Sequence, residues 1–233
     1  MAQIETALLS AYRKDDRLRD FAKGLVDLGW KLLASAGTKK FLDRYGIPSQ
    51  DVGDMVGPPI LGHRVVTLDR KIYAAILGRF DNPDDMAELK RIGVDPIYLV
   101  YVDLYPLADE LASRECSVRS VIEKTDIGGP TLLRAAAKGG GYVVSSPDQF
   151  DGVLKFIQSP PSQQSPVGIK VAHRFLARLA SEAEEKVARY AALSAAFYSS
   201  VADGDFPERW HQPELARDTE FSDTAMNFLR RTA

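Results

Sequence analysis

The chain has 233 residues, 45% of them hydrophobic and 27% charged, so it is long enough to bury a core and act as an enzyme. Its formal net charge of -2 gives no overall attraction for nucleic acid or an anionic membrane, and no stretch approaches a membrane span. Cys116 is the only cysteine, which excludes an intrachain disulfide and fits a reducing compartment. The first residues lack the basic and apolar regions of a secretory signal, so we expect a cytoplasmic protein.

Short apolar runs alternate with amphipathic segments in the first two-thirds of the chain, which predicts a parallel sheet covered by helices. The clearest strand is 96–103, rich in β-branched and aromatic residues, and it ends where a functional loop is expected to emerge. The other predicted strands are 7–9, 30–34 and 142–145, and the predicted helices are 18–28, 38–45, 71–78, 83–92, 147–157 and one that begins at Pro130.

A polar, proline-rich segment at 159–166 interrupts this pattern and marks a boundary. It divides the chain into an α/β domain at 1–158, a linker at 159–166, and C-terminal helices with a tail at 167–233. Apolar spacing over 171–201 predicts two helices that pack on the first domain or on a second subunit. The remainder, 205–233, is predicted to be an arm docked on a surface.

The segment 125–138 joins a carboxylate on a glycine-broken turn to an alanine-rich helix with basic groups. Arg134 and Lys138 lie four residues apart and therefore on one helix face, so Asp126 and two bases are expected around a pocket that suits an anionic substrate. The alternative is structural. Asp126 would then cap the helix, and Lys138 would be a favourable charge near the helix C-terminus.

A phosphate site is predicted at Ser35, Gly37 and Thr38, which lie between a strand and a helix N-terminus, where backbone N–H groups and the helix dipole favour an anion. Lys14, after the first strand, is placed to add positive charge. An ordinary capped turn is the alternative. Three scattered histidines, His63, His173 and His211, have no metal-ligand spacing, so no metal site is expected.

The 125–138 segment is similar to the IDIGGPTxxRAAAKN segment of the IMP cyclohydrolase domain found in bifunctional purine-biosynthesis proteins. Further words resemble that family in the same order, from about Ala7 to Gln158, and a weaker echo follows at 194–197. They are ALLS at 7–10 with Lys14, FAKGL at 21–25, LASAGT at 33–38, GHRVVTL at 62–68 and DLYP at 103–106.

This resemblance implies a three-layer α/β fold with a parallel sheet of methylglyoxal-synthase-like type, followed by C-terminal helices and an arm. It implies a hydrolase acting on cyclic amidines in the ring-closing direction: the formylated aminoimidazole carboxamide ribonucleotide (FAICAR) closes to IMP with loss of water. No cofactor or metal is implied. The expected ligand is a purine-type ribonucleotide 5′-phosphate, and a homodimer is expected. Because the RYGENPHQ word is absent, formyl transfer is not expected.

The resemblance also implies roles for individual residues. Asp126 would hold the carboxamide and accept its proton, Lys138 would polarise the formyl oxygen, and Tyr105 would supply a hydroxyl. Tyr105 before a proline is alternatively a loop-packing residue. The implied substrate-binding residues are Ser10, Lys14, Ser35, Gly37, Thr38, Arg64, Thr67, Ile127 and Gly128.

The departures from the family pattern cluster near the implied site. Val66 replaces a catalytic lysine and Asp69 a histidine. Losing one preorganised donor typically costs about 2.7–4 kcal/mol of transition-state stabilisation, so either activity is weak, a neighbour compensates, or the substrate differs. The alternative function is a nucleotide-binding or regulatory module of the same fold. In addition, Tyr12 replaces a serine and Ala36 replaces a glycine. Asp103 and Gly139 each replace an asparagine.

Overall fold

The structure is a computed structural model that describes residues 5–62 and 64–207. The chain divides into two compact units. The α/β unit comprises residues up to 104 together with 128–184, and the helical unit comprises 105–127 together with residues from 185 onward. These units do not follow the linear division predicted at 159–166, because the chain leaves the α/β unit at 105 and returns to it at 128. Most of the predicted arm, from residue 208 on, lies outside the described residues.

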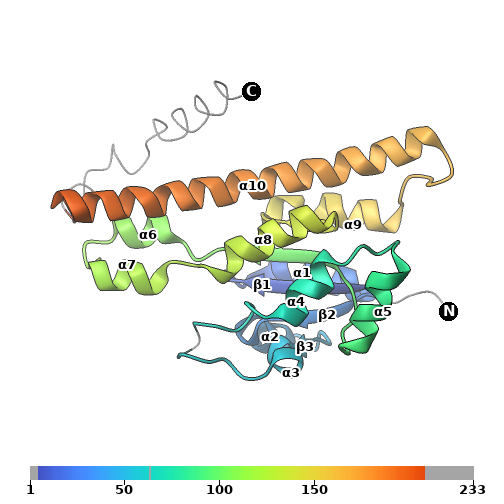
Figure 1. The fold of residues 1–233 in the computed structure, drawn as a ribbon, viewed down its shortest axis with the longest axis horizontal. Helices are drawn as coiled ribbons and strands as arrows, with labels where there is room; N and C mark the ends of the chain where they lie inside the picture. Colours follow the sequence, from blue (N-terminus) through green and yellow to red (C-terminus); the bar gives the residue numbers. More distant parts are fainter. Residues whose placement is uncertain (1–4, 63, 208–233) are drawn as a thin grey trace. The chain divides into compact units, whose positions relative to one another are not determined.

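The α/β unit is built on a five-stranded sheet in which every pair of neighbouring strands is parallel (Figure 1). The strand order is β3-β2-β1-β4-β5. The sequence predicted four of the strands but not β3, which has only two residues. The strands are β1 (Thr6–Ala11), β2 (Lys31–Ala34), β3 (Gln50–Asp51), β4 (Ile97–Asp103) and β5 (Tyr142–Val144).

Helices cover this sheet, as the predicted α/β architecture requires, with α1 against α9 and α4 against α8 (Figure 1). Each predicted helix is present within a few residues of its expected bounds. The helices of the unit are α1 (Asp16–Asp27), α2 (Ala36–Asp43), α3 (Val52–Val56), α4 (Arg70–Leu77), α5 (Pro83–Arg91), α8 (Gly128–Gly139), the 3-10 helix η1 (Pro147–Gln149) and α9 (Phe150–Gln158).

An aromatic cluster joins α1 and α9 to the sheet. Phe21 stacks on Phe150 with ring centroids 4.1 Å apart, and Tyr101 of β4 meets the Phe150 ring edge-on at 4.9 Å. All three side chains are almost fully buried. Such ring pairs add about 0.5–1.5 kcal/mol each beyond the area that they bury. The cluster therefore fixes both helices to strand β4.

The order of the strands places a switch point between β1 and β4. The chain runs from β1 outward to β2 and β3, then returns to β4 on the other side of β1. Ala11 is in register with Asp103, and Leu9 with Ala34, so these three strands end at one edge of the sheet. In open α/β sheets, ligands bind in the crevice beyond the carboxyl ends of the strands at such a reversal. This edge is therefore where a ligand site is expected.

Among the described residues, the segment after the predicted linker forms one helix, α10 (Pro166–Asp203), which Figure 1 shows as uninterrupted. The prediction of two helices over 171–201 is wrong. The physical reason is that no glycine or proline lies between residues 169 and 203, so nothing ends the helix until Gly204, whose φ is +79°. Residues of α10 up to 184 belong to the α/β unit, and those from 185 belong to the helical unit.

The helical unit contains two short helices, α6 (Leu107–Ala112) and α7 (Val118–Lys124), beside the last turns of α10. Its core consists of buried apolar side chains: Leu107, Leu111, Cys116, Val121 and Phe197. Lys124 of α7 forms an ion pair with Glu110 of α6. The sequence pattern did not reveal α6 or α7, because helices of six and seven residues are too short for a periodicity of 3.6 to repeat.

Candidate active site

Lys14 lies at the sheet edge just beyond β1. Its ammonium donates hydrogen bonds to the carbonyl oxygens of Ala11 at 2.8 Å and Tyr12 at 2.9 Å. A Cβ added at Gly37 would lie 3.7 Å from the Lys14 Nζ, so the ammonium stands beside the first turn of α2. Partial burial lowers the pKa of Lys14, and the nearby Arg44 lowers that pKa further, whereas Asp103 raises it. Lys14 and the turn at 35–38 therefore lie next to each other, as the sequence predicts.

Thr38 connects that turn to the end of β1. Its side chain is buried, and its Oγ1 accepts hydrogen bonds from the Ala11 N–H and from the Ser35 hydroxyl, both at 3.0 Å. Ser35 is the N-cap residue of α2, yet its hydroxyl makes no capping hydrogen bond to the helix backbone. The turn is thus held by the threonine rather than by an ordinary cap. Ser10 is half-buried one residue earlier on β1.

Thr67 and Gly128 come together although they are far apart in sequence. A Cβ added at Gly128 would lie 2.9 Å from the Thr67 hydroxyl oxygen, so glycine is the residue that fits here. Gly128 also opens α8, two residues before the predicted start at Pro130, which is a correction to that boundary. Proline is tolerated at the third position as well, because the first four N–H groups of a helix have no helical acceptor.

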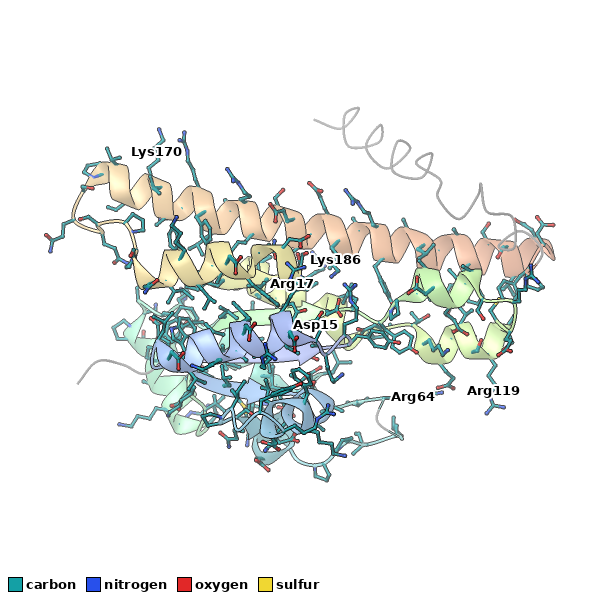
Figure 2. The ribbon with its side chains drawn as sticks, turned by 180° about the vertical axis from the view of Figure 1, so that it is seen from behind. Asp15, Arg17, Arg64, Arg119, Lys170 and Lys186 are labelled. Atoms are coloured by element: carbon teal, nitrogen blue, oxygen red, sulfur yellow. The ribbon has the colours of Figure 1, made fainter. Side chains whose placement is uncertain are left out.

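The segment before α4 carries the other predicted residues. Arg64 is exposed on the loop between α3 and α4, where Figure 2 labels it, and Val66 is half-buried. Asp69, which the sequence resemblance matched with a histidine, is the N-cap of α4, and its carboxylate accepts a hydrogen bond from the Lys71 N–H at 2.7 Å. Asp69 therefore has a structural role in this chain.

Lys138 occupies the other end of α8 from Gly128. Ten residues separate the two, which corresponds to about 15 Å of helix rise. Lys138 lines an open hollow of about 660 Å³ with residues of α4, α8 and α10, all within the α/β unit. In this hollow the Tyr73 hydroxyl donates to Thr131 Oγ1 at 2.8 Å, and Arg134 forms an ion pair with Glu184 at 3.2 Å. Lys138 therefore lies at the opposite end of α8 from the contact between Gly128 and Thr67.

The helical unit brings together the two other predicted catalytic residues. The Asp126 carboxylate accepts a hydrogen bond of 3.5 Å from the Tyr105 N–H. The Asp126 N–H in turn donates to the Tyr190 hydroxyl at 2.8 Å. Burial raises the pKa of Tyr190 to about 12, so this hydroxyl is neutral at physiological pH. Ile127, the next residue, is 59% exposed.

Sequence reasoning missed Tyr190. A signal was present, because Tyr190, Leu193 and Phe197 follow helical spacing on one face of α10, and all three pack in the core of the helical unit. A tyrosine on an apolar helix face is usually a core residue, so its hydroxyl contact with Asp126 could not be anticipated.

Tyr190→Phe is expected to lower the turnover number about tenfold and to lower the melting temperature, because the Asp126 N–H loses its acceptor; a lost buried partner costs about 1–3 kcal/mol. The measurement is turnover beside thermal unfolding. Tyr198→Phe is the matched control, since Tyr198 lies on the same helix and is 51% exposed. Equal turnover in the two variants would contradict the role of Tyr190.

Two classes of site find no support within the described residues. No group of three or more His, Cys, Asp or Glu side chains among residues 5–62 and 64–207 is arranged to hold a metal ion. In the same part of the chain, no helix combines the length and the apolar character needed to cross a membrane.

Comparisons with known proteins find one family of relatives. The MGS-like domain family matches residues 17–131. The bifunctional purine biosynthesis protein PurH of Acidithiobacillus ferrooxidans is 37% identical over 215 residues, which cover 89% of this chain and 40% of that protein. PurH of Thermosynechococcus vestitus is 39% identical over 188 residues, covering 79% and 36%. The chain thus spans about two fifths of the length of these curated relatives.

One solved structure is similar to this chain, and the similarity covers the whole length of the solved chain. The crystal structure of ForH matches with a TM-score of 0.67 and 30% sequence identity, covering 84% of this chain and 100% of the ForH chain.

Proposed function

We propose that this chain, which belongs to the MGS-like domain family, closes FAICAR to IMP with loss of water, or performs the same ring closure on a close analogue. The relatives named for purine biosynthesis support this choice of substrate class. The observation that carries the proposal is the approach of the Asp126 carboxylate to Tyr105, two residues 21 positions apart in sequence. Cytoplasmic location and a homodimer stay predictions.

The proposed reaction needs an acid–base group but no oxidant or reductant. The carboxamide nitrogen attacks the formyl carbon, which forms the new C–N bond and a tetrahedral adduct. The formyl oxygen then leaves as water, with one hydrogen from the carboxamide nitrogen and one from the formamido nitrogen. We assign to Asp126 the acceptance of the carboxamide proton and to Tyr105 a hydroxyl in the same network. Lys138 is assigned to the developing oxygen charge.

The phosphate of the substrate is assigned to the turn at 35–38 and Lys14. Backbone N–H groups at the start of α2 and the Lys14 ammonium are both suited to an anion. The Ser35 hydroxyl and the buried Thr38 make this turn rigid, which reduces the entropy lost when the phosphate binds. Ser10 and Gly37 complete this proposed group. Arg64, Thr67, Ile127 and Gly128 are assigned to the base and the carboxamide.

An ultraviolet assay for cyclisation, run beside a measurement of IMP binding, tests the proposed function. Cyclisation that depends on enzyme concentration supports it. IMP binding without cyclisation would instead favour the second candidate, a nucleotide-binding or regulatory module. The specific observation in favour of that candidate is Val66, which can neither carry charge nor donate a proton where the family has a lysine.

Val66→Lys separates the two candidates. If the site is a weakened cyclohydrolase site, the added ammonium should raise the cyclisation rate by about tenfold or more. If the site has been reshaped for another ligand, the lysine should bring no gain in cyclisation and should weaken nucleotide binding, because a charge replaces an apolar contact. The measurement is the cyclisation rate together with the IMP dissociation constant.

Leu68→Lys is the matched control for this variant, because Leu68 is 39% exposed two residues further along the same segment. An equal effect of both lysines would reflect charge in general rather than position 66. No change in either assay with Val66→Lys would mean that this side chain does not face the ligand, and the assignments of Arg64 and Thr67 would fall with it.

A further inference from the structure

Asp103 is a buried carboxylate at the switch point of the sheet. It ends β4, and its side chain is only 5% exposed. Its Oδ2 accepts a hydrogen bond from the Arg13 backbone N–H at 2.8 Å and a longer one from the Arg13 Nε at 3.4 Å. Its backbone carbonyl accepts from the Tyr12 N–H at 3.2 Å. Asp103 therefore holds two consecutive residues of the segment that follows β1.

This segment determines where the Lys14 ammonium lies. The ammonium donates to the carbonyl oxygens of Ala11 and Tyr12, and both carbonyls belong to the stretch of backbone that Asp103 fixes. Ala11 is also tied to α2 by the hydrogen bond from its N–H to Thr38 Oγ1. Asp103, the segment 11–14 and the turn at 35–38 thus form one connected group, all within the α/β unit.

We infer that Asp103 is a positioning residue, which fixes the Arg13–Lys14 backbone so that the Lys14 ammonium stands over the turn at 35–38 to receive a phosphate. This rests on the proposed function only in assigning a phosphate to that turn. It also gives a role to one departure from the family pattern, the aspartate in place of an asparagine, which adds negative charge beside an anion site.

Charge alone predicts the opposite effect from positioning. A carboxylate beside a bound phosphate repels it, and removing that carboxylate would also leave the Arg13 guanidinium uncompensated. If Asp103 acted only through its charge, Asp103→Asn would therefore strengthen phosphate binding. If Asp103 acts by holding the backbone, the same variant should weaken binding, since the Arg13 N–H loses a charged acceptor and Lys14 loses its fixed position.

The experiment measures the affinity for ribose 5-phosphate by titration calorimetry on the full chain. Asp103→Asn is expected to lower the affinity about tenfold, the loss of one charge-assisted contact. Asp103→Glu keeps the charge but moves the carboxylate by one methylene, so it is expected to weaken binding as well. Thermal unfolding shows which variants stay folded, and either folded variant is sufficient for the test.

A second readout distinguishes positioning from a general loss of structure. The charged groups near the Lys14 ammonium are Asp103 on β4 and Arg44 after α2, and they raise and lower its pKa, respectively. Without the Asp103 charge the pKa of Lys14 falls further, so the ammonium loses its proton at a lower pH. The alkaline decline of phosphate affinity should therefore move to lower pH in Asp103→Asn but stay in place in Asp103→Glu.

Asp85 offers a matched control, because it makes the same contacts elsewhere in the α/β unit. Its Oδ2 accepts from the Arg79 backbone N–H at 2.8 Å and from the Arg79 Nε at 2.9 Å, between α4 and α5. Asp85→Asn is expected to leave ribose 5-phosphate binding unchanged. An equal loss in this variant would mean that any aspartate–arginine pair matters to folding and would overturn the specific role of Asp103.

The possible outcomes separate this inference from the proposed function. Wild-type affinity in Asp103→Glu, or an unchanged or raised affinity in Asp103→Asn, overturns the positioning role. No binding of ribose 5-phosphate by the wild-type chain overturns it too, together with the phosphate assignment. Binding that behaves as expected in a chain that fails to cyclise FAICAR leaves the role of Asp103 standing and removes only the proposed ring closure.

Discussion

Asp126→Asn is expected to lower the turnover number for ring closure by about a hundredfold or more, the usual contribution of a positioned general base. The amide has nearly the shape of the carboxylate but cannot accept the carboxamide proton. Its oxygen can still accept the long hydrogen bond from the Tyr105 N–H, and the Asp126 N–H keeps its bond to Tyr190. The stability of the fold should therefore change little.

The measurement combines turnover with the melting temperature. Asp109→Asn is the matched control, since Asp109 is an exposed aspartate in the first turn of α6 within the same unit, and it should behave as wild type. A large fall of melting temperature in Asp126→Asn, with turnover falling only in proportion to unfolded protein, would support the alternative that this residue caps a helix.

The regular part of the fold could be predicted from the sequence because its signals are local. The run at 96–103 is long and β-branched, and the amphipathic helices of the α/β unit repeat their apolar spacing over two or more turns. The start of α8 was misplaced because Pro130 is compatible with several positions in a first turn. The division into units was not predictable, since it depends on a helix-forming excursion at 105–127 that joins distant residues of α10.

In the candidate site, too, some contacts could be predicted from the sequence and others could not. Lys14 and the turn at 35–38 follow directly from strand–loop–helix order, so their proximity could be expected. The contact between Tyr190 and Asp126 spans 64 residues, and the hold of Asp103 on Arg13 spans 90. Neither has a local signature. In both cases the positioning residue, Tyr190 or Asp103, lies on an element that comes close to its partner only when the chain folds.

Lys138→Ala is expected to lower turnover by about a hundredfold or more, because removing one preorganised donor to a developing oxyanion costs about 2.7–4 kcal/mol of transition-state stabilisation. Binding of IMP should weaken but stay measurable. Arg134→Ala is the matched control, one turn earlier on α8 and lining the same hollow. Its ion pair with Glu184 is exposed, so its loss should cost at most about 1 kcal/mol of stability.

The position of Lys138 makes this variant the most informative test of the proposed mechanism. About 15 Å of helix rise separates Lys138 from Gly128, so one substrate can contact both residues of the same helix only if the substrate and the lysine side chain together span most of that distance. Unchanged turnover in Lys138→Ala would remove this residue from the chemistry and leave the developing oxyanion without its assigned partner. If turnover falls as expected, mixing the inactive Lys138→Ala and Asp126→Asn chains shows whether one site takes its residues from one copy of the chain or from two. Recovered activity would mean that two copies contribute one residue each, and no recovery would require both from a single chain.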